Sequence, residues 1–262
     1  MTTGAPLPVE KTATLPIIVF IGPSRPKGGL PGDLDCLICP PAAQGDLAAC
    51  VLDHGPCIIA LIDGVFQGQP AVRHKEILWA ISRGARVYGA ASMGALRAAE
   101  MAPSGMLGLG LAYRWYRRFP LTPDDAVAVL HAPADLGSVP LTEALLDMRM
   151  TLKALQRSGV IGRLDADKLA GIAAAMPYPE RTWPALLARA GGLDMALTQA
   201  EIDRHRVTAK ADDAARLLHH LRDMQHSGQW PDMVPSPPFE MTTAFADDLA
   251  DAGFQLQDFL SV

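Results

Sequence analysis

The chain has 262 residues, of which 49% are hydrophobic and 19% are charged, and its formal net charge is -5. This length and apolar content suffice to bury a core in one large domain or two small ones. Lysine and arginine are scattered, so the sequence shows no electrostatic footprint for nucleic acid. The N-terminal segment has no apolar signal-peptide core, and no window approaches the roughly 18 apolar residues of a membrane span. We therefore expect a cytoplasmic protein that binds neither nucleic acid nor membrane.

Short apolar runs alternate with helical patterns through the first half of the chain. The predicted strands cover residues 15–22, 35–40, 57–63, 85–90 and 127–130. The predicted helices between them cover residues 42–55, 70–84 and 92–101. This alternation is typical of an α/β fold with a mostly parallel sheet flanked by helices.

The pattern becomes almost wholly helical near residue 139. Apolar residues recur at helical spacing from 141 to 225, and a last helix is predicted near 242–252. We therefore expect an α/β core over residues 1–138 and a mainly helical extension over residues 139–262.

All four cysteines lie in the first quarter of the chain, and Cys36 and Cys39 form a C-x-x-C pair. Such a pair can bind zinc or carry redox chemistry, but zinc would need a second Cys or His pair at suitable spacing. The run around the pair is apolar and strand-like, which favours structural thiols. Adjacent His219 and His220 on a helix do not face each other, so they predict no metal site. We expect neither a metal nor a cofactor.

The segment Tyr88–Glu100, YGAASMGALRAAE, carries most of the chemical information. A strand leads into small residues, then into Ser92, Met93 and Gly94, and then into a helix, which is the pattern of a nucleophile elbow. The amides of Met93 and Gly94 at the helix N-terminus would then bind an oxyanion. Serine is also a favoured helix N-cap, so Ser92 is either a nucleophile or a cap.

A serine nucleophile needs a base, and the candidate is His131, at the end of the fifth predicted strand. The carboxyl ends of parallel strands share one edge of the sheet, where ligands bind, so Ser92 and His131 would meet there. Asp63, Asp125 or Asp135 would orient the imidazole, and Asp63 could instead position a water. The structural alternative for His131 is a hydrogen bond to a carbonyl.

Further residues near this edge are candidates for substrate binding. Gly22 and Ser24 close the first strand, and Gly64 closes the third. His74 and Lys75 open the next helix, where Lys75 could attract an anionic group such as a carboxylate. An ordinary turn at Gly64 and a solvated helix face would explain the same residue types.

Several strings within residues 17–150 resemble the TfuA-like family. They are FIGPS, CPPAAQGDL, IDGVFQGQPAVRHKEILWAISRGARVYGAASMGALRAAEM, DDAVAVLHAPAD and LTEAL. The resemblance implies an accessory protein that works beside a YcaO-type cyclodehydratase to install a thioamide in the backbone of a ribosomal precursor peptide. It also implies the sulfur source, a small ThiS-like sulfur-carrier protein with a C-terminal thiocarboxylate.

Two functions fit this resemblance. The first is a thiocarboxylate hydrolase that releases sulfide next to the YcaO site, because Ser92, the two helix amides and His131 supply the groups that acyl hydrolysis needs. The second is a non-catalytic adaptor that docks the sulfur carrier or the precursor peptide onto the YcaO enzyme. In the adaptor, Ser92 is a helix cap and His131 is structural.

Overall fold

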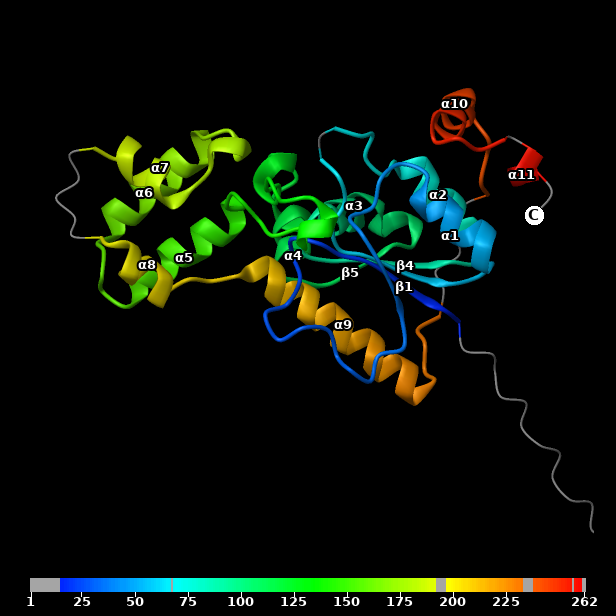
Figure 1. Cartoon of the computed structure of the whole chain (residues 1–262), viewed down its shortest axis with the longest axis horizontal. Helices are drawn as coiled ribbons and strands as arrows, with labels where there is room; N and C mark the ends of the chain where they lie inside the picture. Colours follow the sequence, from blue (N-terminus) through cyan, green and yellow to red (C-terminus); the bar gives the residue numbers. More distant parts are fainter. Residues whose placement is uncertain (1–14, 67, 192–196, 233–237, 256, 261–262) are drawn as a thin grey trace, which may run out of the picture.

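The computed structural model describes residues 15–260, apart from 67, 192–196, 233–237 and 256. Its centre is a parallel sheet with the strand order β2-β1-β3-β4-β5 (Figure 1). The strands are β1 (Ile17–Phe20), β2 (Leu37–Cys39), β3 (Ile58–Leu61), β4 (Arg86–Gly89) and β5 (Leu107–Gly108). The predicted α/β fold with a parallel sheet is confirmed.

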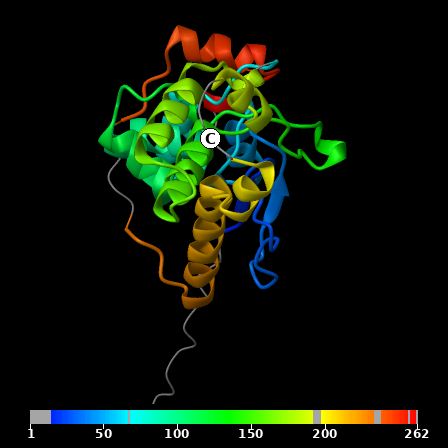
Figure 2. The ribbon, with the colours of Figure 1, turned by 90° about the vertical axis from the view of Figure 1, so that its left-hand side faces the viewer.

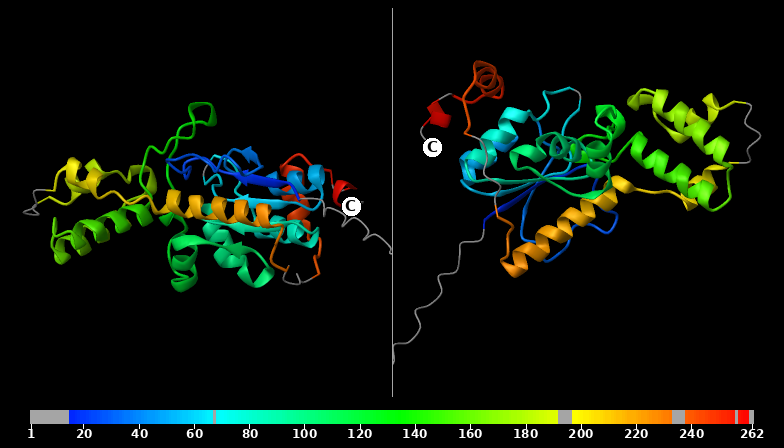
Figure 3. Two further views of the ribbon diagram at one scale, coloured as in Figure 1. Left: turned by 90° about the horizontal axis from the view of Figure 1, so that it is seen from below. Right: turned by 180° about the vertical axis from the view of Figure 1, so that it is seen from behind.

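Helices cover both faces of the sheet. Three of them follow strands in the predicted order, and they are α1 (Asp46–His54), α2 (His74–Ser82) and α3 (Met93–Met101). Apolar residues of these helices share one core with Ile18, Phe20 and Ile59 of the strands. The opposite face receives no helix from the β1–β2 connection, so it is covered from the far end of the chain by α9 (Ala209–Ser227). Figure 3, seen from below, shows α9 lying along this face.

The prediction of a fifth strand at residues 127–130 was wrong. The fifth strand of the sheet is β5, which pairs with β4 through Tyr88 and Leu107. Val127 is buried instead among helical residues such as Leu145. A run of four apolar residues indicates only that the segment is buried. It does not show whether the segment packs against helices or lies in a sheet. The helix that follows β5, α4 (Gly110–Arg118), was not predicted.

The second half of the chain is helical, as expected. One group consists of α5 (Leu145–Arg157), α6 (Arg163–Ala175), α7 (Trp183–Arg189) and α8 (Gln199–Arg204). It forms one end of the molecule, which Figure 2 views head-on. The last helices, α10 (Thr243–Asp251) and α11 (Gln257–Leu260), lie at the opposite end beside α2 (Figure 1). Within the described part of the chain, no helix combines the length and apolar character required to cross a membrane.

One buried carboxylate holds two of the helices together. Glu76 in α2 is 1% exposed, and its Oε1 accepts hydrogen bonds from the amides of Leu47 and Ala48 at the start of α1. Its other oxygen, Oε2, has no hydrogen-bond partner among the described residues. Burial raises the pKa of Glu76 to about 7, although the backbone donors partly oppose this shift. Glu76 is therefore a structural carboxyl group, and the folded protein is most stable when this group is protonated.

We expect Glu76→Gln to change the pH dependence of stability. The raised pKa means that the folded state binds more protons than the unfolded state between the two pKa values, so wild-type stability falls as pH rises through this window. Glutamine keeps the acceptor oxygen and removes the charge. The stability of the variant relative to wild type should therefore increase by about 3 kcal/mol between about pH 5 and about pH 8. Urea unfolding at both pH values measures this change, and a constant difference would contradict the expectation.

Candidate functional site

The carboxyl ends of β1 and β3 meet at the point where the strand order reverses, which is where open α/β sheets bind ligands. Asp63, just after β3, is 1% exposed. Its Oδ2 accepts hydrogen bonds from the amides of Gly22 (2.8 Å) and Ser24 (2.9 Å), and its Oδ1 accepts one from the Ser24 hydroxyl (2.7 Å). The structure thus brings these three predicted residues together. Both carboxylate oxygens of Asp63 bind the loop after β1, which gives Asp63 a positioning role.

We expect Asp63→Asn to destabilise the protein by about 3 kcal/mol, because the amide nitrogen would face a donor and the buried charge-assisted bonds would be lost. Ser24→Ala, which removes one hydroxyl donor, should cost about 1 kcal/mol. Denaturant unfolding of the two variants measures both values. Equal stability of wild type and Asp63→Asn would mean that this network does not fix the loop.

The turn between β4 and α3 is strained. The amide of Ser92 donates a 2.7 Å hydrogen bond to the carbonyl of Ala90, and the residue between them, Ala91, has φ 64°. A three-residue turn with positive φ at its centre is the rare γ-turn, which is unfavourable for a residue with a Cβ. Backbone strain of this kind is concentrated at ligand and catalytic sites. The turn delivers Ser92 to the carboxyl edge of the sheet.

Helix α3 begins unusually close to the sheet. A Cβ on Gly94 would lie 1.6 Å from the carbonyl oxygen of Leu61, so only glycine fits there. The Gly94 amide donates a 3.3 Å hydrogen bond to the carbonyl oxygen of Ile62. This amide was one of the two predicted donors to an oxyanion, and it is already occupied. In this geometry an oxyanion site would therefore depend on the Met93 amide alone, and not on the Met93 and Gly94 amides together.

Ser92 lies in a small cavity and does not cap α3. Its side chain makes no capping hydrogen bond, and its Oγ donates only a long one, 3.4 Å, to the carbonyl of Val127. Ser92 as a whole residue is 7% exposed. The cavity has a volume of about 20 Å³, room for roughly one water molecule. Its lining residues include Asp63, Gly64, Ser92, Met93, Val127 and His131.

His131 shares this small cavity with Ser92. Its Nδ1 donates a 2.8 Å hydrogen bond to the carbonyl of Ala132, which leaves Nε2 as an acceptor. Its backbone forms an isolated antiparallel bridge with Pro140 rather than extending the sheet. Among the hydrogen bonds of the described residues, none joins Ser92 to His131. A water in the cavity could join them, whereas a direct pair is not present in this structure.

His74 and Lys75 do not line the small cavity. His74 Nε2 lies 2.8 Å from Glu100 Oε2 near the end of α3. Lys75 donates to the carbonyl of Glu240 and lies over the ring of Phe239. Both side chains therefore connect α2 to other elements of the fold, and their role as substrate-binding residues gains no geometric support.

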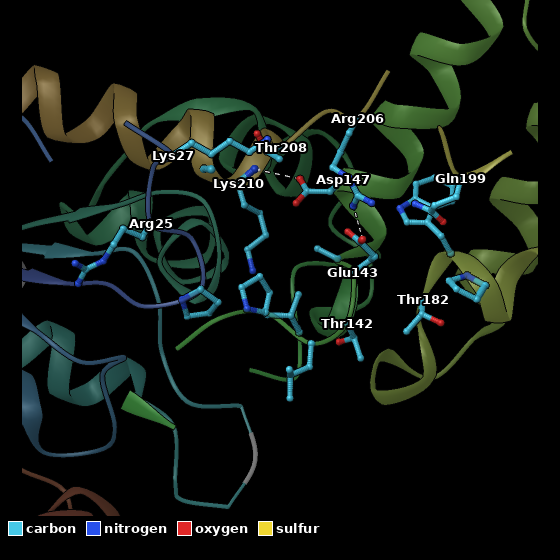
Figure 4. Close-up of a pocket in the computed structure, with 18 residues that line it drawn as sticks. Arg25, Lys27, Thr142, Glu143, Asp147, Thr182, Gln199, Arg206, Thr208 and Lys210 are labelled. Carbon is cyan, nitrogen blue, oxygen red and sulfur yellow. Dashed lines mark hydrogen bonds and ion pairs between the residues drawn. The ribbon is translucent and has the colours of Figure 1, made fainter. Parts of the chain in front are cut away.

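A larger cavity of about 600 Å³ lies next to the small one, and Pro23 and Val129 line both. Its walls come from the loop after β1, from the segment before α5, and from α5, α7, α8 and α9. Figure 4 shows Lys210 reaching from α9 into this cavity, with Asp147 and Arg206 on one side and Arg25 on the other. Arg206 is paired with Glu143 and Asp203. The cavity is thus bordered by charged groups of both signs, with cationic side chains in the majority.

Sequence reasoning missed Lys210, which is 4% exposed. Its Nζ donates a 2.6 Å hydrogen bond to the carbonyl of Val127, the same oxygen that Ser92 contacts. A signal was present, because Lys210 lies on the apolar stripe of α9 with Ala214, Leu217 and Leu221. A lysine on a buried stripe is rare unless its charge is compensated.

Charge compensation around Lys210 comes from two carboxylates. Burial lowers the pKa of Lys210, while Asp63 and Asp147 oppose this shift. Asp147 in α5 accepts a hydrogen bond from the Lys210 amide, and burial raises the pKa of Asp147 to about 7 despite the nearby Lys210. The amine is therefore more readily deprotonated than an ordinary lysine.

The cysteines lie apart from both cavities. All four are free thiols, and burial raises the pKa of Cys50 to about 12 and that of Cys57 to about 11. Thiols with such values stay protonated and unreactive near neutral pH. Within the described ranges, no group of three or more His, Cys, Asp or Glu side chains is arranged to hold a metal ion.

The fold and site define an α/β protein with a serine-containing cavity at the carboxyl edge of a parallel sheet. Residues 63–182 match the family model described as TfuA-like protein, which supports the resemblance of the chain to the TfuA-like family. The matched segment contains Asp63, Ser92 and His131 and ends before Lys210. No curated protein matches the chain.

Proposed function

We propose that this protein is an accessory hydrolase for YcaO-dependent thioamidation, and that it releases sulfide from the C-terminal thiocarboxylate of a ThiS-like sulfur-carrier protein. The proposal rests on the family match together with one observation at the ligand-binding edge of the sheet. The strained turn there places Ser92 in a cavity, and the Ser92 side chain makes no capping hydrogen bond to α3. A serine that served only as a helix cap would use its hydroxyl on the helix amides.

The groups in the small cavity suit acyl transfer. Ser92 Oγ would attack the carbonyl carbon of the thiocarboxylate, and the Met93 amide at the start of α3 would stabilise the developing oxyanion. The helix N-terminus adds a favourable partial positive charge at the same point. Departure of sulfur as hydrosulfide leaves an acyl group on Ser92, and water must then remove it.

His131 suits the second half of this reaction. Its Nε2 has a free lone pair, because Nδ1 donates to Ala132, and the small cavity has room for roughly one water. A water between His131 and the acyl group would lose its proton to Nε2 as it attacks. Asp63 takes no part in proton transfer in this scheme. It has a positioning role, because its carboxylate holds the loop of Gly22 and Ser24 beside the cavity.

The larger cavity suits the substrate. The carrier would present its thiocarboxylate on a flexible C-terminal tail, and the tail must pass through an opening that accommodates several residues. The cavity of about 600 Å³ next to the small one provides this space, with Arg25 and Lys27 on its wall to attract an anionic group. A YcaO enzyme and its precursor peptide would receive the released sulfide.

The test is sulfide release from a thiocarboxylated ThiS-like protein by the purified chain, with and without the YcaO partner. Multiple turnovers of sulfide release would support the hydrolase. If the wild type releases none in either mixture, yet binds the carrier or the precursor peptide and the YcaO enzyme, the protein is an adaptor. The same carrier with an ordinary C-terminal carboxylate controls for sulfide from other sources.

A further inference from the structure

A further concave surface, the α4–α5 groove, shares no lining residue with the small or the large cavity. Its volume is about 400 Å³, which is enough to accept several side chains. Its floor consists of apolar residues that are partly or fully buried, and they are Leu111, Trp115, Leu146 and Met150. The ring of Phe119 also lines the groove and is 55% exposed. The proposed hydrolysis uses none of these residues.

Helical spacing places one wall of the groove on α4. Leu111, Arg114, Trp115 and Arg118 stand at positions i, i+3, i+4 and i+7, which share one face of a helix. The other face of α4 is fixed to the fold, because it buries Ala112 and Tyr116. The stripe that lines the groove is therefore the face of α4 that the rest of the fold leaves uncovered.

Helix α5 supplies the opposite wall with the same combination of side chains. Leu146, Arg149 and Met150 stand at positions i, i+3 and i+4, so an arginine again accompanies two apolar residues. The guanidinium of Arg149 lies 5.6 Å from the ring centroid of Trp115 on α4. A contact of this kind leaves the N–H donors of the guanidinium available to a further partner.

The three arginines of the groove lack carboxylate partners. Arg114, Arg118 and Arg149 are exposed, and none of them takes part in an ion pair between described residues. Arg114 acts on buried Asp213 through its charge without forming such a pair. Among the described residues, no aspartate or glutamate lines the groove. The groove is thus cationic in a chain whose net charge is -5.

Helix dipoles explain only one of these arginines. Arg118 lies in the last turn of α4, where a cation is favourable. Arg114 lies near the middle of α4, and Arg149 lies in the first half of α5, where the dipole offers a cation no benefit. Solvation of a helix face would not combine cations with an apolar floor. The combination fits a ligand that is both apolar and anionic.

We propose that the α4–α5 groove binds an acidic segment of a partner protein. An aromatic or long aliphatic side chain of the segment lies on the apolar floor, and its carboxylates pair with Arg114, Arg118 and Arg149. Arginine suits this role because its planar guanidinium binds a carboxylate through two parallel hydrogen bonds. Tryptophan and arginine are also the residues that most often dominate the binding energy of protein interfaces. The inference goes beyond the proposed hydrolase and does not depend on it.

Charge and shape favour this occupant over three others. A second copy of the chain bound symmetrically would place the same arginines against each other. A lipid surface covers protruding apolar side chains, whereas Leu146 on the floor of the groove is 2% exposed. Nucleic-acid bases stack on aromatic faces, and Arg149 already lies over Trp115.

The test measures binding of synthetic peptides to the full chain by fluorescence anisotropy. The probe is a labelled peptide in which one phenylalanine and one leucine are flanked by glutamates. We expect saturable binding that weakens at least about 5-fold between about 50 mM and about 300 mM salt, because salt screens the ion pairs. Replacing the glutamates by glutamine, or the two apolar residues by serine, should each weaken binding by about 10-fold.

Variants with matched controls locate the binding site. Arg114→Glu and Arg149→Glu should each weaken binding at least about 10-fold, because like charges then face the peptide. Arg157→Glu changes an exposed arginine of α5 that does not line the groove, so it should bind within about 2-fold of wild type. Phe119→Ala should weaken binding by about 5-fold. Leu121→Ala, which removes a 97% exposed side chain outside the groove, should not.

These surface variants keep the buried face of each helix, and circular dichroism checks that they fold. In hydrogen exchange, the bound peptide should protect residues 110–119 and 145–150. The proposal is overturned if no acidic peptide binds, or if Arg149→Glu binds the probe as tightly as wild type. Tighter binding of a single-stranded RNA or of phosphatidylserine vesicles would assign the groove to phosphate groups. Self-association of the chain that Arg149→Glu abolishes would assign it to a second copy. The sulfide assay tests the hydrolase separately, because the peptide measurement involves no sulfur transfer.

Discussion

Ser92→Ala is expected to lower sulfide release from the thiocarboxylated carrier by at least about 10³-fold, because the proposed reaction passes through an acyl group on Ser92. The same variant should leave stability almost unchanged, within about 0.5 kcal/mol. The hydroxyl caps no helix amide and makes a single hydrogen bond of 3.4 Å, so its loss leaves little unsatisfied.

This pair of measurements separates nucleophile from cap. If Ser92 were only a helix cap, the Ser92→Ala substitution would lower the stability of the protein by about 1 kcal/mol and would leave the rate of sulfide release unchanged. Sulfide is followed with a methylene blue or fluorescent assay, and stability with urea unfolding. Ser158→Ala, directly after α5 and outside the lining of the small cavity, is the matched control and should keep full release. Full release by Ser92→Ala would move the chemistry to a water held by His131.

The second large effect concerns the fold beneath the site. Gly94→Ala is expected to destabilise the protein by at least about 3 kcal/mol, because the new Cβ would lie 1.6 Å from the Leu61 carbonyl oxygen. Neither atom can yield without moving β3 or α3. The variant should also lose sulfide release in the carrier assay, since a displaced α3 would carry the strained turn away from Val127.

Gly171→Ala is the matched control for Gly94→Ala. Gly171 lies inside α6, and nothing lies within 4 Å of a Cβ placed there. The same change should therefore raise stability by about 0.5–1 kcal/mol, through helix propensity alone. Thermal or urea unfolding of both variants gives the comparison. If the two variants had similar stabilities, the close approach of α3 to β3 would not matter energetically.

The site residues that could be predicted from sequence follow directly after buried strands. Asp63 follows β3 and Gly22 follows β1, and parallel strands bring their carboxyl ends to one edge whatever the side-chain details. Ser92 could be located because small residues around it indicated a tight turn. Helix bounds such as those of α2 and α3 were also close to expectation, since apolar periodicity and glycines mark them.

Other features depend on tertiary packing that local patterns do not contain. His74 and Lys75 start a helix near the predicted edge, but their side chains bind Glu100 and Glu240 instead. Val127, at the start of the apolar run 127–130, is buried by helices, and a strand pattern does not distinguish this kind of burial from burial in a sheet. Lys210 reaches Val127 across a long separation in sequence. No local rule places α9 over the face that the β1–β2 connection leaves bare.

The position of α9 in the chain also governs when the site can exist. The ribosome makes the sheet strands and Ser92 early, and Lys210 only after α5–α8. Until α9 docks, the sheet face formed by Val19, Ile58 and Ala60 has no helix over it, and the carbonyl of Val127 lacks its hydrogen bond from Lys210. Long-range closures of this kind form late in folding. Under the proposed function, sulfide release would therefore begin only once the last layer of the fold is in place.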